Sequence, residues 1–122
     1  MRYMTMIKVV EGKYGSPPPA LMQAMGKLQE DATKAGVLVE VGGLKSSATG
    51  ASLRLANGKI TVVDGPFTEA KELIGGYAVY DTKTKEECIE WARRFLAIHK
   101  EHWPGFEGEV ELREMMVFTP GR

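Results

Sequence analysis

The stretch LIGGYAVYDTKTKEECIEWARRFLAIHKEH, residues 73–102, decides the fold because it joins a strand to a helix across a clear boundary. Residues 73–81 are rich in β-branched and aromatic side chains, which is typical of a strand. Thr84 and Glu87 form a capping box, which predicts that a helix begins directly after Thr84. The apolar residues of that helix share one face of an ideal helical wheel. We therefore expect the helix to pack through this face onto a sheet that contains the strand.

The N-terminal part of the chain predicts the same combination of strand and helix. Residues 2–10 are apolar on both faces, which is typical of a central strand. Apolar residues at helical spacing predict a helix over residues 20–35, with Ser16 as a candidate cap before three prolines. Gly36 is placed to end this helix, and residues 37–44 form the next predicted strand.

Residues 51–64 predict a hairpin, because two alternating runs are joined by Asn57-Gly58, a dipeptide typical of a type I′ turn. The double glycine at 75–76 indicates a bulge or the close approach of another backbone. Residues 109–118 are the last predicted strand. Without the hairpin, the order is βαββαβ, so we predict an α+β, ferredoxin-like fold with an inserted β-hairpin.

This plan leaves one face of the sheet uncovered, because two helices cover only one face of an antiparallel sheet. We expect Met4, Met6, Tyr80 and Met115 on the uncovered face. That set is too apolar to remain in contact with water. Burial against the same face of a second copy gives a two-fold homodimer, which we take as the expected assembly.

The composition describes one globular domain over residues 1–122 and excludes several classes of protein. The 16 basic and 16 acidic residues cancel, so no net charge favours nucleic acid or a membrane surface. No segment has the length of a signal peptide or a membrane span, which predicts a cytoplasmic protein. Cys88 is the single cysteine. We expect no disulfide, no metal site and no cofactor.

The densest group of polar residues is DGPFTEAKE, residues 64–72. One interpretation is that Asp64 is an acid/base or ligand-orienting group at a strand end, with glycines that let a ligand approach the backbone. The other is that Asp64 only forms a turn by accepting hydrogen bonds from the backbone, while Phe67 fills the core. Spacing alone favours the turn.

The segment VVDGPFTEAKELIGGY, residues 62–77, resembles the signature of the DGPF branch of the YCII-related proteins. The opening MRYMTMIK, the segment AGVLVEVGGL and the helix with WARRF are similar to that family in kind and order. The resemblance implies a dimeric α+β barrel with a cleft in each subunit. It implies a proposed enzymatic role without an established substrate, and some members are encoded beside sigma factors of transcription.

The resemblance raises the standing of Asp64 as a catalytic or ligand-binding residue, with Glu69, Lys71 and the stretch Gly75, Gly76 and Tyr77 as further ligand-binding candidates. Shorter YCII-type relatives carry a His in the first helix and an Asp near its end. Residues 20–35 contain no His, so that dyad is not carried over. We expect a homodimer that binds a small molecule near Asp64, with or without acid/base chemistry. The alternative is a non-catalytic accessory or regulatory protein, linked to transcriptional control.

His99 lies in the middle of the apolar stripe of the second helix, and His102 lies one turn further on. His99 is a candidate site base if burial moves its pKa. The simpler interpretation is that the helix end turns both imidazoles toward the following loop, where they bond to the backbone. Two histidines make an incomplete metal site. Cys88, on the same stripe, is expected to serve packing.

Overall fold

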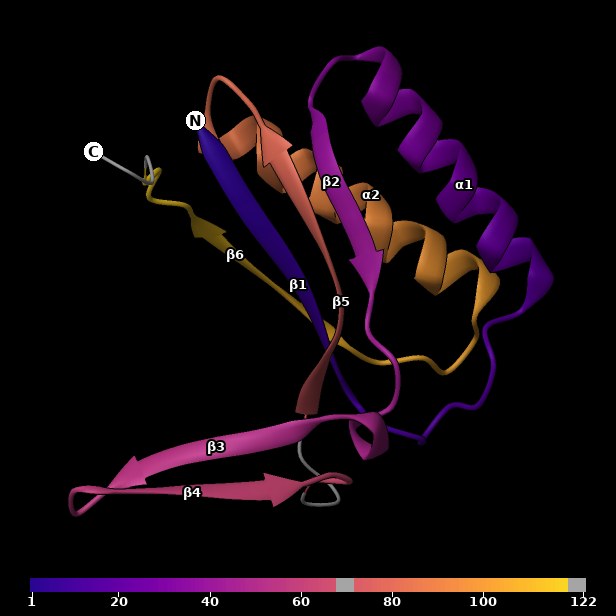
Figure 1. Cartoon of the computed structure of the whole chain (residues 1–122). Coiled ribbons are helices and arrows are strands. Elements are labelled where there is room, and N and C mark those ends of the chain that lie inside the picture. Colours follow the sequence, from indigo (N-terminus) through magenta and orange to yellow (C-terminus); the bar gives the residue numbers. More distant parts are fainter. Residues whose placement is uncertain (68–71, 119–122) are drawn as a thin grey trace.

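The computed structural model describes residues 1–67 and 72–118. Six strands, two α-helices and one short 3₁₀ helix are found in this part of the chain (Figure 1). Their order and bounds are β1 (Arg2–Val10), α1 (Pro19–Lys34), β2 (Leu38–Gly43), η1 (Ser47–Thr49), β3 (Ala51–Ala56), β4 (Lys59–Asp64), β5 (Glu72–Asp81), α2 (Lys85–His102) and β6 (Glu109–Glu114).

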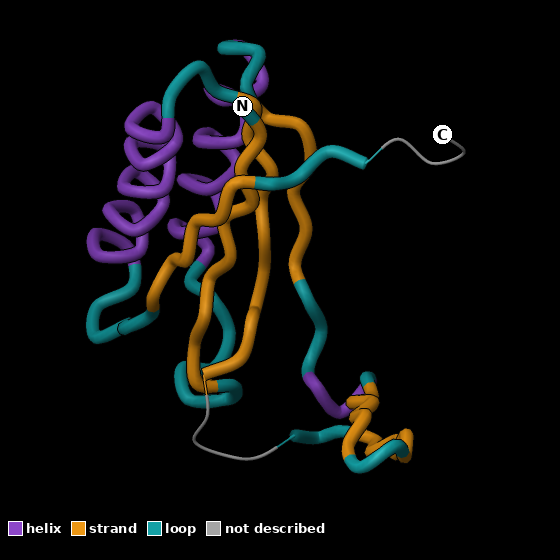
Figure 2. The backbone as a smooth tube through the Cα atoms, turned by 90° about the vertical axis from the view of Figure 1, so that its left-hand side faces the viewer, coloured by secondary structure: helices purple, strands orange, loops and turns teal. Residues whose placement is uncertain are grey.

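Four strands form an antiparallel sheet in the order β2-β5-β1-β6, and β3 and β4 form a separate two-stranded ribbon. Both helices lie on one face of the four-stranded sheet (Figure 2). Without β3 and β4, the chain has the predicted βαββαβ order. The prediction of an α+β fold with an inserted hairpin is therefore confirmed.

Several boundaries follow the local signals in the sequence. The Thr84 hydroxyl accepts a hydrogen bond from the Glu87 amide at 3.1 Å and caps α2 as predicted. Gly36 follows α1 at φ +74°, and Asn57 and Gly58 have φ of 53° and 74°, which the tight hairpin turn requires. The register skips Gly75 between the pairs Ile7↔Gly76 and Lys8↔Ile74. This skip is the predicted bulge.

Two predicted boundaries are wrong. Ser16 does not cap α1, because the cap position is Pro18 and the helix begins with Pro19. The last strand ends at Glu114 rather than at residue 118. Its partner β1 begins at Arg2, whose carbonyl accepts a hydrogen bond from the Met115 amide at 2.8 Å. Beyond that bond β1 offers β6 no further backbone partner, so the ladder stops.

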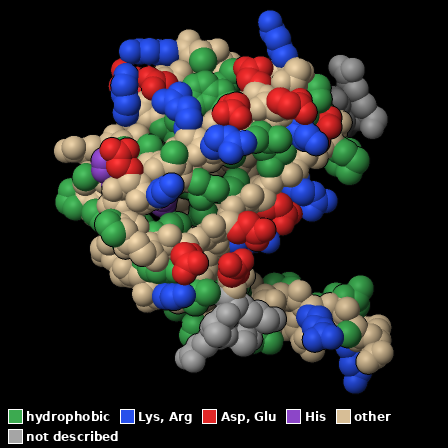
Figure 3. Space-filling model, turned by 180° about the vertical axis from the view of Figure 1, so that it is seen from behind, with side chains coloured by type: hydrophobic (Ala, Val, Ile, Leu, Met, Phe, Trp, Pro, Cys, Tyr) green, Lys and Arg blue, Asp and Glu red, His purple; other side chains and the backbone are tan. Residues whose placement is uncertain are grey.

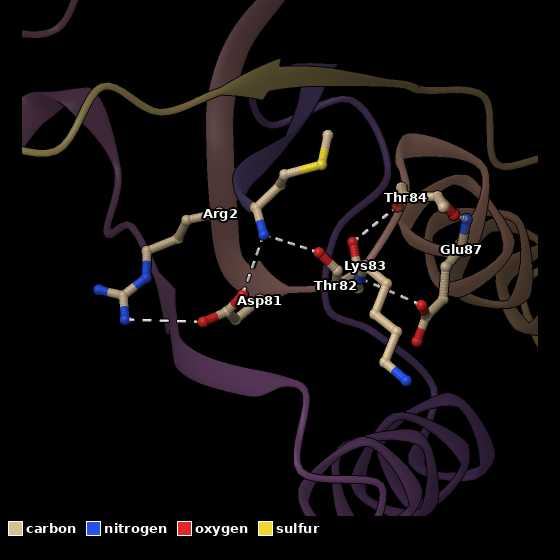
Figure 4. A network of polar contacts seen from close by, with 7 residues as sticks. Arg2, Asp81, Thr82, Lys83, Thr84 and Glu87 are labelled. Carbon is tan, nitrogen blue, oxygen red and sulfur yellow. Dashed lines mark hydrogen bonds and ion pairs between the residues drawn. The ribbon is translucent and has the colours of Figure 1, made fainter.

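The N-terminus is fastened to the junction between β5 and α2 (Figure 4). The Met1 amino group donates to Asp81 Oδ1 at 3.3 Å and to the Thr82 carbonyl at 2.8 Å. The Thr82 hydroxyl in turn donates to the Thr84 carbonyl at 2.8 Å, next to the helix cap. These bonds hold the beginning of β1, the end of β5 and the beginning of α2 together.

The main core cluster lies at this same end of the sheet, where Tyr3, Ala32, Val37, Tyr80 and Cys88 pack together. Tyr80 was expected on the uncovered face, and that expectation is wrong. It pairs with Tyr3 in the sheet, so both side chains point toward the helices. Its ring stacks on Trp91 of α2, with centroids 6.2 Å apart. We call this region the closed end.

The β3–β4 hairpin stands apart from the sheet, on the side opposite the helices (Figures 1 and 2). The pairs Leu53↔Val62 and Leu55↔Ile60 place four large apolar side chains on one face of the ribbon. These side chains are 62–73% exposed. We call this surface the hairpin apolar face. Leaving it in water is unfavourable, and a lone two-stranded ribbon is only marginally stable.

The uncovered face of the sheet is less apolar than expected. Met4 and Met6 lie on it, but their neighbours across β6 are Arg113 and Glu111. Lys8 on the same face pairs with Glu111 at 3.2 Å.

On the opposite side of the molecule, acidic and basic side chains are intermingled over the helices (Figure 3). Among the described residues, neither α1 nor α2 is long and apolar enough to cross a bilayer.

Candidate functional site

A cavity of about 620 Å³ lies between the helices and the sheet and extends from Tyr80 of the core cluster to the loops at the opposite end. Ligand sites typically enclose about 300–1,000 Å³, so this volume is in the range for a small organic molecule. Its floor is formed by the helix-facing residues of β1 and β5, and its walls by α1, α2 and the loops that follow β1 and α2. The lining residues include Thr5, Ile7, Tyr14, Gln29, Gly42, Gly43, Gly75, Gly76, Tyr77, Ala78, Tyr80, Ala92, Phe95, His99, Trp103 and Phe106.

Gly43 and Gly76, which pair on the face of the sheet that the helices cover, explain why the sheet leaves space at this end. Gly42 and Gly43 end β2, and they pair with Tyr77 and Gly76 of β5. A Cβ on Gly76 would come within 3.2 Å of the Gly42 carbonyl oxygen, so the two backbones approach each other closely. Without side chains on this part of the floor, nothing fills the space beneath α1.

Aromatic rings form one wall of the cavity. The Phe106 ring lies at the centre of this group, with centroids 5.0 Å from Tyr14, 4.8 Å from Trp103 and 5.0 Å from His99. The Phe95 ring lies 4.4 Å from His99. We call these five residues the aromatic wall. Phe95, His99 and Trp103 follow one another at a spacing of four residues along α2 and its end, and tertiary packing adds Tyr14 from the loop after β1.

His99 is the one imidazole in the aromatic wall, and it is 6% exposed. Its Nδ1 lies 2.8 Å from the Phe95 carbonyl oxygen. A carbonyl oxygen only accepts, so Nδ1 carries the proton and the neutral ring keeps its lone pair on Nε2. Burial lowers the pKa of His99 below its usual value near 6.5. The neutral ring is therefore the form present at pH 7.

Among the described residues that line the cavity, none is Asp, Glu, Lys or Arg. A second hollow, of about 730 Å³, lies on the other side of His99 between α2 and β6. Its wall includes Arg93, Lys100 and Glu107. The two spaces therefore differ in chemistry, because only the second offers a charged molecule a partner.

Three of the predicted ligand-binding residues, Gly75, Gly76 and Tyr77, line the cavity together with His99. The Tyr77 hydroxyl donates to Glu40 Oε2 at 2.8 Å. This bond to the carboxylate raises the pKa of Tyr77. Tyr77 therefore stays un-ionised at neutral pH, and its proton is already engaged.

Asp64 lies at the end of β4, is exposed, and is not part of the cavity wall. The adjoining residues are held by the turn that contains η1. The Gly65 amide donates to the Gly50 carbonyl at 2.9 Å, and the Phe67 amide donates to the Ser47 hydroxyl at 3.1 Å. The structure thus places Asp64 apart from Gly75, Gly76, Tyr77 and His99.

Residue 65 must be glycine here, because a Cβ would lie 1.6 Å from the Ser47 carbonyl oxygen. This part of the motif therefore has a structural task, which is to join the hairpin to the turn after β2. Glu69 and Lys71 lie outside the described residues. Their part in a site stays a prediction.

Most residues of the cavity wall were not predicted from the sequence. Tyr14, Phe106 and the glycine pair of β2 were assigned to loops or strand ends, and Phe95 to simple packing. The signal that was present is the pair of double glycines, at 42–43 and 75–76, in two strands that pair in the sheet. Where two paired strands both carry glycines, we expect a hollow in that part of the sheet.

Cys88 is 0% exposed within the core cluster, as expected for a packing residue. Burial raises the pKa of the Cys88 thiol to about 11. His102 is half-buried at the end of α2, and its Nε2 lies 3.8 Å from Glu101 Oε2. Within residues 1–67 and 72–118, no three His, Cys, Asp or Glu side chains gather closely enough to hold a metal ion.

Comparison with known proteins places this architecture in a family. An uncharacterised protein of Rhizobium meliloti (strain 1021) is 29% identical over 101 residues, which cover 83% of this chain and 77% of that relative. The YCII-related domain matches residues 1–115, which include every strand and helix described above. The chain therefore belongs to the YCII-related domain family.

Proposed function

We propose that this protein binds a small, uncharged and mainly apolar molecule in the cavity between the helices and the sheet. The observation that carries the proposal is a space of about 620 Å³ whose described wall holds aromatic and aliphatic side chains and no charged one. Transfer of an ion into such a wall without a partner is strongly unfavourable. An apolar molecule gains roughly 25 cal/mol for each Å² of its surface that leaves water.

Among the described residues of the cavity wall, His99 is the candidate base for acid/base chemistry. His99 is the wall residue whose ordinary titration range is closest to neutral pH. Its Nε2 has no hydrogen-bond partner among the described residues. Binding is the function that the geometry supports, and proton transfer through His99 is the chemistry that the same site allows.

The two tryptophans give a direct test of binding. Trp103 belongs to the aromatic wall, whereas Trp91 packs at the closed end. We expect 2-methoxynaphthalene, an uncharged aromatic probe, to shift the indole N–H signal of Trp103 in a ¹H–¹⁵N spectrum and to leave that of Trp91 unchanged. Equal small shifts of both signals, or no shift at saturating probe, would contradict binding in the cavity.

A matched pair of variants on α2 sharpens this test. Ala92 lines the cavity, whereas Ala97 lies on the exposed side and borders only the second hollow. Ala92→Leu narrows the cavity and is expected to weaken binding of the probe at least about tenfold. Ala97→Leu is expected to leave it unchanged. If both variants bind as wild type does, the probe lies elsewhere.

The same titration tests the role predicted for Asp64. Asn keeps the shape of the side chain and loses its charge, so Asp64→Asn distinguishes a ligand-contacting carboxylate from a turn residue. Because Asp64 lies outside the cavity wall, we expect the affinity for the probe to be unchanged and the melting temperature to fall little. A loss of affinity of about tenfold or more in Asp64→Asn would assign the carboxylate to the site.

The proposal includes a homodimer, in which a second copy covers the hairpin apolar face. Two apolar segments support this occupant. The hairpin and the segment Met116–Phe118, which is 77–78% exposed, both project on the side of the sheet that the helices leave uncovered (Figure 2). A two-fold axis through that side lets each copy place its hairpin against the other, so one contact is made twice.

Sedimentation velocity at micromolar concentration tests the dimer. We expect a species of about 27 kDa, twice the 13.4 kDa of one chain. Leu55→Lys on the hairpin apolar face is expected to give a monomer, because a charge would be buried at the contact. Thr61→Lys, on the opposite face of the same ribbon, is the matched control and is expected to remain a dimer.

An accessory or regulatory role is the second candidate, and the exposure of the hairpin apolar face favours it if wild type sediments as a monomer. In a monomer, no second copy covers the hairpin apolar face. A different partner protein would be needed to bury it.

A further inference from the structure

We propose that the ligand of the cavity is an aromatic molecule that carries a hydroxyl or N–H group, and that this group donates a hydrogen bond to Nε2 of His99. The inference rests on the proposed function, because it names the class of molecule that the cavity takes. Besides being uncharged and mainly apolar, the proposed ligand has two further properties. One is a flat ring, and the other is a single hydrogen-bond donor.

The flat ring follows from the aromatic wall. Trp103 and Phe106 are nearly parallel, at an interplanar angle of 21°, and their centroids are 4.8 Å apart. His99 and Trp103 are also close to parallel, at 30°. Planar side chains in this arrangement present ring faces and edges to the cavity. Aromatic molecules pack on such surfaces in offset or edge-to-face geometry and gain about 0.5–1.5 kcal/mol beyond the burial of area.

The donor follows from the state of His99. Nδ1 is engaged with the Phe95 carbonyl, so Nε2 is the acceptor that the neutral ring has left. No described residue bonds to Nε2, although the side chain as a whole is 94% buried, the complement of its 6% exposure. No fully buried side-chain nitrogen or oxygen among the described residues lacks a partner, so Nε2 keeps some accessible surface, and His99 borders both the cavity and the second hollow.

Two hydroxyl groups of the lining residues are already in use. The Thr5 hydroxyl donates to the Ala78 carbonyl at 3.1 Å, and the Tyr77 hydroxyl donates to Glu40. A ligand that donates to Nε2 therefore gives the imidazole the hydrogen bond that no described residue supplies. Because burial lowers the pKa of His99, the lone pair on Nε2 is available at pH 7.

Carboxylates and amines fit this wall poorly. The described lining contains no Lys or Arg to pair with a carboxylate, and no Asp or Glu to pair with an ammonium group. Phenols, indoles and similar molecules meet all the conditions. They are flat, they remain un-ionised at neutral pH, and each has one donor.

The experiment compares two probes that differ only in the donor. 2-Naphthol has a hydroxyl group where 2-methoxynaphthalene has a methyl ether, and the ring system is the same. Their dissociation constants at pH 7 are measured by the shift of the Trp103 indole signal. We expect wild type to bind 2-naphthol at least about tenfold more tightly, because the ether leaves Nε2 without its hydrogen bond.

Two variants assign the preference to Nε2. His99→Phe keeps a ring in place and removes the acceptor, so it is expected to bind both probes equally. Tyr14→Phe removes the other hydroxyl of the aromatic wall, and it is expected to keep the preference for 2-naphthol. Equal affinity for the two probes in wild type would overturn the inference and leave the proposed function intact.

Failure of the proposed function has a different result, because then neither probe shifts Trp103 in wild type. A preference that survives in His99→Phe and disappears in Tyr14→Phe would also overturn the inference, since the donor would then contact the tyrosine. Both variants must show the wild-type pattern of dispersed amide signals, which separates a lost contact from a lost fold.

Discussion

At the closed end, Tyr3, Ala32 and Cys88 are 0–2% exposed, whereas at the other end the same two layers enclose about 620 Å³. The chain is the same sandwich of two helices on a sheet at both ends. The difference lies in the side chains of the floor. Tyrosines pair across β1 and β5 at the closed end, and glycines pair across β2 and β5 at the cavity.

In this fold, one end of the layer between helices and sheet provides stability and the other end provides space for binding. Cross-strand pairs of large side chains fill the layer and fix the distance between helix and sheet. Pairs of glycines leave the layer empty while the backbone ladder continues. The closed end therefore holds the helices in position, and the cavity needs little packing of its own.

The largest difference between the two ends is expected for removal of an aromatic ring. Tyr3→Ala leaves a void in a filled layer and is expected to lower the free energy of unfolding by about 3–5 kcal/mol. Phe95→Ala removes a ring that already borders open space, so we expect a loss of about 1–2 kcal/mol. Chemical denaturation of both variants measures these values. Equal losses would show that the cavity end is packed as tightly as the closed end.

Thiol labelling gives the next largest contrast. With a pKa of about 11 and no exposed surface, Cys88 is expected to react with a disulfide reagent at pH 8 only when the region opens. A cysteine introduced by Ala92→Cys, in a Cys88→Ala background, faces the cavity and is expected to react at least about 100-fold faster. Similar rates for the two thiols would contradict the difference in packing.

A smaller effect is expected when a side chain is enlarged. Ala32 is 0% exposed, so Ala32→Leu overpacks the closed end and is expected to cost about 1–3 kcal/mol. Ala92→Leu grows into the cavity and is expected to remain within about 0.5 kcal/mol of wild type, or to stabilise the protein. Thermal melts of the two variants provide the measurement. A destabilised Ala92→Leu would mean that the cavity does not accept a larger side chain.

The smallest effect is the dependence of stability on pH through His99. Its pKa is lowered by burial, so the unfolded chain takes up a proton near pH 6.5 while the folded chain does not. Stability from this residue is present above that pH and is lost as the pH falls below it, by at most about 1.4 kcal/mol per pH unit. His99→Gln is expected to show a shallower fall between pH 7.5 and 5.5. Identical profiles in the two proteins would show that His99 does not carry this dependence.

Most of the fold can be predicted from the sequence, because the signals for helix ends, turns and bulges depend on only a few neighbouring residues. Thr84 caps α2, Gly36 ends α1, Asn57-Gly58 turns the hairpin and Gly75 forms a bulge, each through local backbone geometry. The spacing of the apolar residues shows which elements are strands and which are helices. From these the order βαββαβ with an inserted hairpin follows without knowledge of any distant contact.

Where the sequence was misread, the deciding partner lies far along the chain. The face of Tyr80 depends on its register opposite Tyr3, and the end of β6 depends on where β1 begins. A shift of one residue in register moves every side chain of a strand to the other face. The pairing of strands fixes that register, and the alternation within one strand does not.

The sequence by itself determined the elements, their order, the family motif and the burial of His99 on an apolar stripe. Only packing between distant segments brought the double glycines of β2 and β5 side by side and placed Tyr14 against the rings of residues 95–106. It also placed Asp64 outside that space. The physical reason is that a cavity is a property of what neighbouring chains leave unfilled, and no local pattern records which segments become neighbours.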